Sequence, residues 1–321
     1  MRAGLEPAVT GATVSSVTVF DERSLRRHPG PSEDFVDRLV GRTFTSAVRR
    51  GKFLWLPLAL PKTQDILPNR LDSSRSGPEP DASPAFSAAP PAEALVVHLG
   101  MSGQVLLRAP GAPDDALTRV RIDLVSPAHG PLVLNFVDQR IFGSMAIDEL
   151  VPTADGRPAG YGGAQAAVAF LPRSVSHIAR DPLDPAFDDR RFFAALAGRK
   201  TSIKRALLDQ GLISGVGNIY ADESLWGARI HYGQPTNTLS SAKAKLLLAE
   251  VRAVLAKALA EGGTSFDAQY VNVNGASGYF SHSLNAYGQQ GKPCPRCGRP
   301  VVREQFMNRG SHFCPHCQRL R

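Results

Sequence analysis

The sequence predicts a multidomain α+β protein with an N-terminal antiparallel β-sandwich or barrel, a helical domain and a small C-terminal β-hairpin built around cysteines. Three observations predict this order. Short β-branched and apolar runs recur up to about residue 150, and the apolar period becomes helical after about residue 188. All four cysteines lie at or after position 294. A chain of 321 residues is long enough for about two domains, each with its own core.

Residues 1–150 are expected to form the β domain. Apolar runs at 13–20, 52–60, 94–101, 104–109, 119–125 and 132–137 are separated by Gly, Pro and Asp, as in antiparallel sandwiches and barrels. Residues 61–93 between two of these runs contain seven prolines and only four large apolar side chains. Such a segment buries too little apolar surface to offset its ordering entropy, so we expect a disordered insertion at a hairpin tip.

A linker at 151–187 is expected to lead into a helical domain at 188–285, because it is rich in Pro and Asp. Helical periodicity predicts helices within 188–199, 201–210, 218–230 and 240–263. The longest begins with Ser240 or Ser241 as a plausible N-cap and meets a stop at Gly262. Its expected apolar face is made by Leu247, Val251, Val254, Leu255 and Ala258.

Composition and charge exclude several classes of protein. The hydrophobic fraction of 43% argues against collagen-like and wholly disordered chains, and no apolar run approaches the roughly 18 residues of a membrane span. Glu6 and Pro7 interrupt the stretch where a signal peptide needs its apolar centre, so a cytoplasmic location is expected. The formal net charge of +8 favours a polyanionic partner.

The cysteine tail at 286–321 carries the strongest motif. Cys294, Cys297, Cys314 and Cys317 form a Cys-x2-Cys-x16-Cys-x2-Cys pattern, which suits a closed tetrahedral shell around one structural Zn²⁺. The alternatives are two disulfides or four free thiols. Seven Lys or Arg residues and a single acid, Glu304, make this hairpin basic, and Arg309 is expected at its tip. A basic hairpin suits a phosphate backbone.

A Gly-rich turn at 211–218 lies between two expected helices, and the second helix begins near Asn218. A free helix N-terminus can bind phosphate, and Arg199, Lys200 and Lys204 add positive charge beside it. The alternative is a plain helix–helix turn that needs glycine only for packing.

Two further turns follow apolar strands and carry an unusual set of side chains. The segments HLGMSG (98–103) and DQRIFG (138–143) present Met101, Arg140 and Phe142. An apolar and an aromatic side chain beside an arginine form a plausible wedge for entering a base stack. The alternative is that Met101 and Phe142 belong to the core.

Together these segments resemble the formamidopyrimidine-DNA glycosylases, which share a fold with endonuclease VIII-like proteins. The resemblance rests on RRGKFL (49–54), HLGMSG, DQRIFG, TSIKRALLDQ (201–210), SGVGNIYADESLW (214–226), GGTSF (262–266), YVNVNGASGYF (270–280) and the cysteine tail. It covers nearly the whole chain except the 61–93 insertion.

The resemblance implies a monomeric, bacterial and nucleoid-associated DNA-repair enzyme. Its activities would be those of a DNA glycosylase and AP lyase that acts on oxidised purines, such as 8-oxoguanine and formamidopyrimidines, in damaged double-stranded DNA. Residues 188–285 would be a helix-two-turn-helix DNA-binding domain and residues 286–321 a zinc finger. No membrane partner is implied.

The resemblance also assigns roles to individual residues. Asn218 and Arg309 would hold the phosphates that flank the lesion, with Lys200 and Lys204 assisting and Arg199 adding charge. Met101, Arg140 and Phe142 would fill the space left by the extruded base, with Arg140 facing the orphaned cytosine. Lys52 would contact DNA and assist β-elimination, and Arg309 would act in δ-elimination.

The sequence departs from the family at its start. The family's nucleophile is an N-terminal proline followed by an acidic glutamate, whereas this sequence begins MRAGLEPAV and has neither. Either the start codon is miscalled and about nine residues are missing, or the chain is a non-catalytic DNA-binding relative; the intact remaining motifs favour the first. Preference for oxidised pyrimidines, as in the endonuclease VIII branch, is a third possibility. Leu117 stands about where many relatives have a phosphate-contacting histidine.

Overall fold

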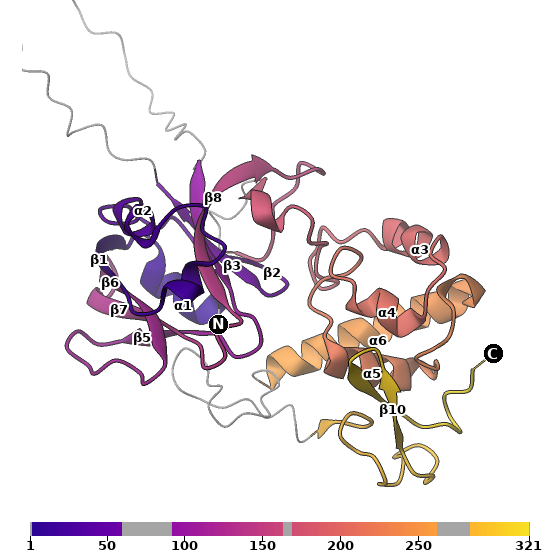
Figure 1. The fold of residues 1–321 in the computed structure, drawn as a ribbon. Coiled ribbons are helices and arrows are strands. Elements are labelled where there is room, and N and C mark those ends of the chain that lie inside the picture. The colour runs from indigo at the N-terminus through magenta and orange to yellow at the C-terminus, as the bar shows by residue number, and fades with distance from the viewer. Residues whose placement is uncertain (1, 60–91, 163–168, 262–282, 321) are drawn as a thin grey trace, which may run out of the picture.

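The computed structural model describes residues 2–59, 92–162, 169–261 and 283–320. These residues form two lobes side by side, a β-rich lobe from the first half of the chain and a helical lobe from the second (Figure 1). The predicted α+β class is confirmed, as is its order of β domain, helical domain and C-terminal hairpin.

The β-rich lobe contains two antiparallel sheets. The first has the order β1-β6-β7-β5, with bounds Thr13–Val19, Thr118–Ser126, Gly130–Val137 and Gln104–Arg108. The second has the order β2-β3-β4-β8-β9, with bounds Val48–Arg50, Phe53–Leu58, Glu93–His98, Ser144–Pro152 and Phe170–Pro172. Helices α1 (Arg2–Val9) and α2 (Ser32–Asp37), and the short 3-10 helices η1 (Glu22–Leu25) and η3 (Arg173–Val175), complete the lobe.

Strand β3 explains why its segment reads as a continuous apolar run. Leu54 and Leu56 point into the core between the two sheets. Phe53 and Trp55 point to the opposite face and join a second cluster with residues of β4, β8 and β9. Because successive side chains of a strand alternate between faces, a strand covered on both sides has no polar alternation.

The expected insertion and the expected linker each contribute residues to strands of this lobe. The expected insertion at 61–93 joins β3 to β4, and residues 60–91 lie outside the described residues; Glu93 begins β4 and pairs with Leu58. The expected linker at 151–187 contributes β9, which pairs with the end of β8.

The helical lobe contains α3 (Asp189–Ala197), α4 (Ile203–Leu208), α5 (Asn218–Ala228), η4 (Thr236–Thr238) and α6 (Ser241–Ala260). All four expected helices are present. Ser240 caps α6 by accepting a hydrogen bond from the Lys243 backbone N–H, and Leu247, Val251 and Leu255 are buried on one face. The expected stop at Gly262 lies outside the described residues.

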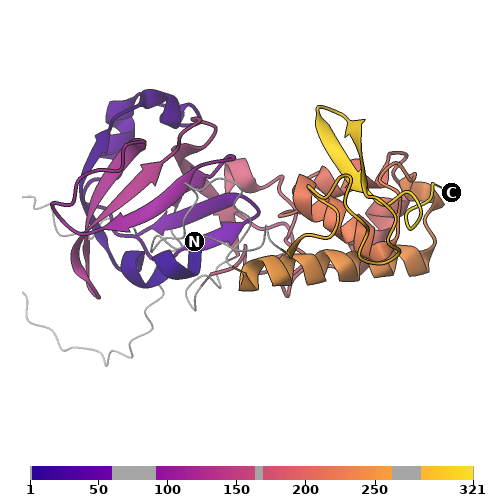
Figure 2. The same cartoon turned by 90° about the horizontal axis from the view of Figure 1, so that it is seen from below.

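The C-terminal hairpin pairs β10 (Val302–Phe306) with β11 (Arg309–Phe313). It stands out from the helical lobe on the side away from α6 (Figure 2). Within the described part of the chain, no helix combines the length and apolar character of a membrane span.

Candidate nucleic-acid interface

A cleft of about 510 Å³ lies between the two lobes and is lined by three separate parts of the chain. The β-rich lobe contributes Lys52 and His98, the start of α5 contributes Asn218, and the hairpin tip contributes Arg309. Three residues that the sequence singled out, Lys52, Asn218 and Arg309, are therefore brought to one surface. The outermost two, Lys52 and Arg309, are more than 250 positions apart in the sequence.

Lys52 lies in the β2–β3 turn, directly after Gly51, which adopts a left-handed conformation with φ of 56°. Its Nζ donates a hydrogen bond to the Gly100 carbonyl oxygen at 3.4 Å. The Lys52 side chain is exposed, but desolvation by the neighbouring cleft wall, and secondly the positive charge of Arg309, lower the pKa of its ammonium. A larger fraction of neutral amine is therefore available here than on an ordinary surface lysine.

Asn218 and Arg309 meet where α5 approaches the hairpin. Asn218 is the first residue of α5, and its Nδ2 donates to the Gly310 carbonyl oxygen at 3.1 Å. Gly217, the N-cap residue, has no side chain to cap the helix, so the first N–H groups of α5 face the cleft without a side-chain cap. Arg309 is the first residue of β11, so it lies at the hairpin tip as expected, and its side chain is exposed.

Lys204 does not reach this surface. Its side chain is fully buried, and its Nζ lies 2.6 Å from Asp222 Oδ1, 2.7 Å from Ser311 Oγ and 3.1 Å from the Gly310 carbonyl oxygen. The sequence analysis expected it to assist at the phosphates. Instead it braces the hairpin against α5, because its face of α4 packs inward.

The other two basic residues of this region, Arg199 and Lys200, lie nearer the surface than Lys204. Arg199 is half-exposed and forms an ion pair with Asp209 at 2.6 Å. Lys200 is exposed.

Met101, Arg140 and Phe142 lie on two adjoining loops. A Cβ on Gly100 would come within 2.5 Å of the Phe142 carbonyl carbon, so only glycine allows this approach. Met101 is 56% and Phe142 50% exposed, and Arg140 is exposed as well. Neither apolar side chain therefore belongs to the core.

The second of these loops is held by charged side chains. Asp138 accepts hydrogen bonds from the Gly143 backbone N–H at 2.6 Å and from Ser102 Oγ at 2.6 Å. Arg26 donates to the carbonyl oxygens of Ile141 and Phe142, both at 2.6 Å. The exposed side chains are consequently carried by a fixed backbone, next to the carbonyl that Lys52 contacts.

His98 is a cleft residue that the sequence analysis missed. It is the last residue of β4, and its Nδ1 is buried without a hydrogen-bond partner among the described residues. Burial, followed by the charges of Arg27 and Lys52, lowers the pKa of His98 to about 4. The sequence signal for His98 is its place as the first residue of HLGMSG, directly after an apolar run.

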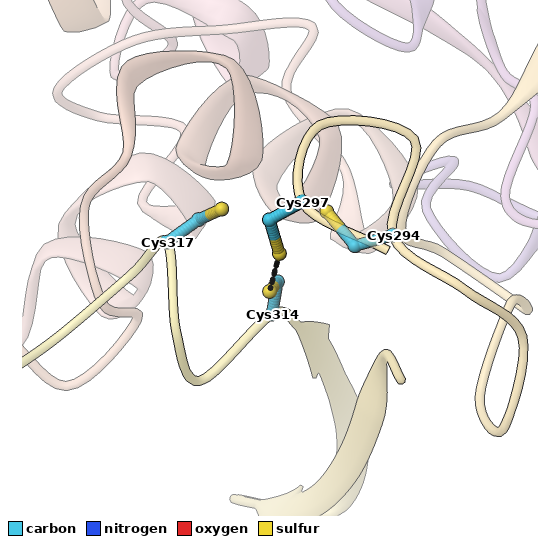
Figure 3. Close-up of side chains that lie close together, drawn as sticks. All are labelled: Cys294, Cys297, Cys314 and Cys317. Atoms are coloured by element: carbon cyan, nitrogen blue, oxygen red, sulfur yellow. Dashed lines mark hydrogen bonds between the residues drawn. The ribbon is translucent and has the colours of Figure 1, made fainter. Parts of the chain in front are cut away.

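The four cysteines form the predicted cluster (Figure 3). Their Sγ atoms lie within 4.8 Å of one another, and all four thiols are free. The Sγ atoms of Cys297 and Cys314 are 3.5 Å apart, well beyond the roughly 2.05 Å of a disulfide. They are close to the separation of about 3.8 Å between thiolates on one tetrahedral zinc. The donor set therefore fits one structural Zn²⁺.

Three parts of the sequence match known domain families. Residues 1–145 match the formamidopyrimidine-DNA glycosylase N-terminal domain, residues 178–269 its H2TH domain, and residues 291–320 the zinc finger found in FPG and IleRS. These domain matches, together with the cleft between the two lobes and the four-cysteine segment, define the class of protein: a DNA-repair glycosylase with a zinc finger.

Whole-chain relatives identify the family. A formamidopyrimidine-DNA glycosylase of Leifsonia xyli is 58% identical over 320 residues, covering 100% of this chain and 97% of that protein. The Thermobifida fusca protein of the same name is 48% identical, covering 99% and 94%. The chain belongs to the formamidopyrimidine-DNA glycosylase family.

Solved structures agree with this assignment. Lactococcus lactis Fpg in complex with DNA containing an abasic site is 26% identical with a TM-score of 0.72, covering 99% of this chain and 96% of that one. The same protein in complex with DNA containing N7-benzyl-Fapy-dG has a TM-score of 0.73, with 26% identity and the same coverage.

Proposed function

We propose that this chain is a monomeric glycosylase and AP lyase that removes oxidised purines from double-stranded DNA. The observation that carries the proposal is the convergence of Lys52, Asn218 and Arg309 on one cleft, beside the exposed side chains of Met101 and Phe142. The Lactococcus relatives, which bind abasic-site and Fapy-dG DNA, support the choice of substrate.

In this proposal the cleft holds the damaged strand by its phosphates. Arg309 supplies a forked cationic donor, and Asn218 supplies the second hydrogen of Nδ2 together with the uncapped start of α5. Because such contacts carry no base information, they fix the register of the strand rather than select the lesion.

Selection of the lesion falls to the two adjoining loops. Met101 and Phe142 enter the stack where the damaged base is extruded, and Arg140 presents its donors to the acceptors of the unpaired cytosine. Extrusion exposes C1′ of the damaged nucleotide. The rigid support from Asp138 and Arg26 lets the loops displace the base instead of yielding to it.

The chemistry requires an amine and an acid. A secondary amine forms a bond to C1′ as the glycosidic bond breaks, and the electron pair of the glycosidic bond leaves with the base, which the acid protonates. The amine then loses its proton, and its lone pair forms the C=N bond as the C1′–O4′ bond breaks and O4′ takes up a proton. The resulting iminium acidifies C2′, so that loss of the C2′ proton expels the 3′ phosphate as the C3′–O bond breaks. Lys52 suits the proton-accepting part of this second step, because its lowered pKa increases the fraction of neutral amine. By the family resemblance, the amine and the acid would be those of an N-terminal Pro-Glu pair.

Two forms of the protein test this proposal: the chain that begins at Met1, and the same chain extended at its start by the family's Pro-Glu segment. Both are assayed on duplexes that carry 8-oxoguanine opposite cytosine or thymine glycol opposite adenine, with borohydride trapping of the iminium. Trapping and preferential cleavage of 8-oxoguanine by the extended form support the proposal.

Each other outcome points to one of the alternatives. Preferential cleavage of thymine glycol would assign the chain to the endonuclease VIII-like branch. Salt-sensitive duplex binding without any trapped adduct in either form would make it a non-catalytic DNA-binding relative.

A further inference from the structure

The C-terminal end of helix α5 reaches the cysteine cluster through Trp226. The indole Nε1–H donates a hydrogen bond to the Sγ of Cys294 at 3.4 Å, a normal length for an N–H···S bond. The indole also packs with the buried residues Cys294, Cys314 and Val301. A donor from outside the hairpin is therefore aimed at one of the four metal-binding sulfurs.

Arg296 fixes this indole from the other side. Its guanidinium carbon lies 4.1 Å from the centroid of the indole ring, and its Nη1 donates to the Trp226 carbonyl oxygen at 2.9 Å. A cation over the ring face draws electron density from the indole and strengthens its N–H as a donor. Arg296 lies between Cys294 and Cys297 in the sequence, so the residue that fixes the Trp226 indole belongs to the first metal-binding turn.

In a zinc–thiolate shell, a hydrogen bond of this kind stabilises the sulfur that accepts it. Four thiolates place an excess of negative charge on the sulfurs of a closed shell, and donors in the surrounding layer relieve that charge and orient the ligands. An N–H that points at a coordinated sulfur makes the sulfur less basic and less reactive toward electrophiles. It also fixes the side-chain rotamer before the metal arrives.

Helix α5 links this contact to the DNA-facing surface. Asn218 begins the helix in the cleft, and two buried acids in the middle hold the C-terminal segment. Asp222 accepts the His312 backbone N–H at 2.9 Å, and Glu223 accepts the Ala286 backbone N–H at 2.8 Å. Trp226 is the last of these contacts along one rigid helix.

We propose that Trp226 is a positioning residue of the zinc site: its indole N–H, held by Arg296, stabilises the Cys294 thiolate in the metal shell. This role strengthens zinc binding and slows attack on Cys294. It concerns the zinc finger alone, so it stands or falls independently of the lesion chemistry proposed above.

Trp226→Phe tests the hydrogen bond. Phenylalanine keeps an aromatic face for Arg296, but it has no N–H donor and a smaller ring. In the full-length protein we expect zinc affinity, measured by chelator competition, to fall about tenfold. In the Co²⁺-substituted protein, the thiolate-to-cobalt charge-transfer band should move to lower energy, because loss of the hydrogen bond raises the sulfur donor orbitals. A role in packing alone would not move that band.

The chain offers a matched control in its other tryptophan. Trp55 is fully buried in the β-rich lobe, so Trp55→Phe makes the same chemical change far from the metal and should leave zinc affinity and the cobalt spectrum unchanged. If Trp226→Phe matches the wild-type protein in both readouts, the proposal is overturned.

A measurement on the wild-type protein covers the case in which the variant fails to fold. The Trp226 indole N–H resonance is recorded with zinc bound and with ¹¹³Cd bound. A shift between the two metals, or a splitting by ¹¹³Cd, is expected for a hydrogen bond to a coordinated sulfur. An identical, unsplit resonance in both forms would refute the bond.

Discussion

Arg309 shows how a single side chain acquires a role from its position at a tip. It is exposed, it lines the cleft, and its charge contributes to lowering the pKa of Lys52 on the opposite lobe. The sequence alone placed it at the hairpin tip, because it lies between the two cysteine pairs. The neighbouring Lys52 was not predictable from spacing, since more than 250 positions separate the two residues.

Arg309→Ala is expected to weaken binding to every duplex, damaged or not, because a phosphate contact carries no sequence information. The slope of log affinity against log salt concentration should fall by about 1, as for the loss of one phosphate contact. Fluorescence anisotropy at several salt concentrations measures both effects. Arg190→Ala on α3, an exposed residue outside the cleft lining, is the charge-matched control. A loss confined to lesion-containing duplex would point instead to lesion reading.

His98 carries a pH dependence that can be measured on stability. Its pKa is lowered to about 4 in the folded chain, whereas an unfolded histidine titrates near its ordinary value of about 6.5. Between these values the unfolded state binds a proton that the folded state excludes. Stability from this residue is therefore complete above about pH 6.5 and is lost as the pH falls toward 4.

His98→Gln should remove this dependence. Between pH 7 and 4.5 we expect the wild-type protein to lose on the order of 2 kcal/mol more unfolding free energy than the variant. Urea unfolding at the two pH values measures the difference. His129→Gln, at an exposed histidine on the β6–β7 turn, is the control for the same change of side chain. Equal pH dependence in wild type and His98→Gln would contradict the assignment.

At the scale of elements, the sequence predicted those whose pattern is local. The period of α6, its Ser240 cap and the cysteine spacing each lie within one short segment. Strands β2, β8 and β9 were not predicted from the sequence. Strands β2 and β9 are three residues long, and Asp148 and Glu149 interrupt the apolar run of β8. Their strand character comes from pairing with β3, β4 and each other, which is a tertiary property.

Lys204 illustrates the same limit for a site residue. On the sequence it stands near Arg199 and Lys200, so a shared role at phosphate was the natural hypothesis. Its partners Asp222 and Ser311 come from α5 and β11, and only the packing of three elements shows that its ammonium points inward. A basic cluster in sequence is thus not necessarily a basic patch in space.

Lys204→Met should destabilise the helical lobe by about 3–5 kcal/mol, because it leaves the carboxylate of Asp222 buried without its cation. The double variant Lys204→Met with Asp222→Asn should recover part of this loss, since asparagine can still accept the His312 N–H. Urea unfolding monitored by Trp226 fluorescence, in a Trp55→Phe background, measures both. A fully stable Lys204→Met protein with reduced DNA affinity would restore the phosphate role.

At the scale of the whole molecule, the segment before Lys52 holds the connection that leads from the β-rich lobe to the helical lobe. Arg50 is buried on β2, and its guanidinium donates to the carbonyl oxygens of Ile178, at 3.2 Å, and Ala159. Burial lowers the pKa of Arg50 to about 10, so it remains charged at neutral pH. Arg49 pairs with the buried Asp181 at 3.5 Å. The position of Lys52 relative to Asn218 and Arg309 therefore depends on two arginines that never face the cleft.

Arg50→Met tests this dependence. The variant leaves the carbonyl oxygen of Ala159, within the β-rich lobe, and that of Ile178, on the connection to the helical lobe, without a donor. This loosens the connection and adds an ordering cost to binding, because the cleft must be assembled on the DNA. We expect duplex affinity to fall about tenfold, or about 1.4 kcal/mol, with a larger radius of gyration by X-ray scattering in the free protein and a normal one in the complex. Arg173→Met, which removes an exposed arginine paired with the exposed Glu149 on the same lobe, should change neither quantity. Unchanged scattering with reduced affinity would show that Arg50 acts on the cleft directly, whereas unchanged affinity would show that the lobes are held by their remaining contacts.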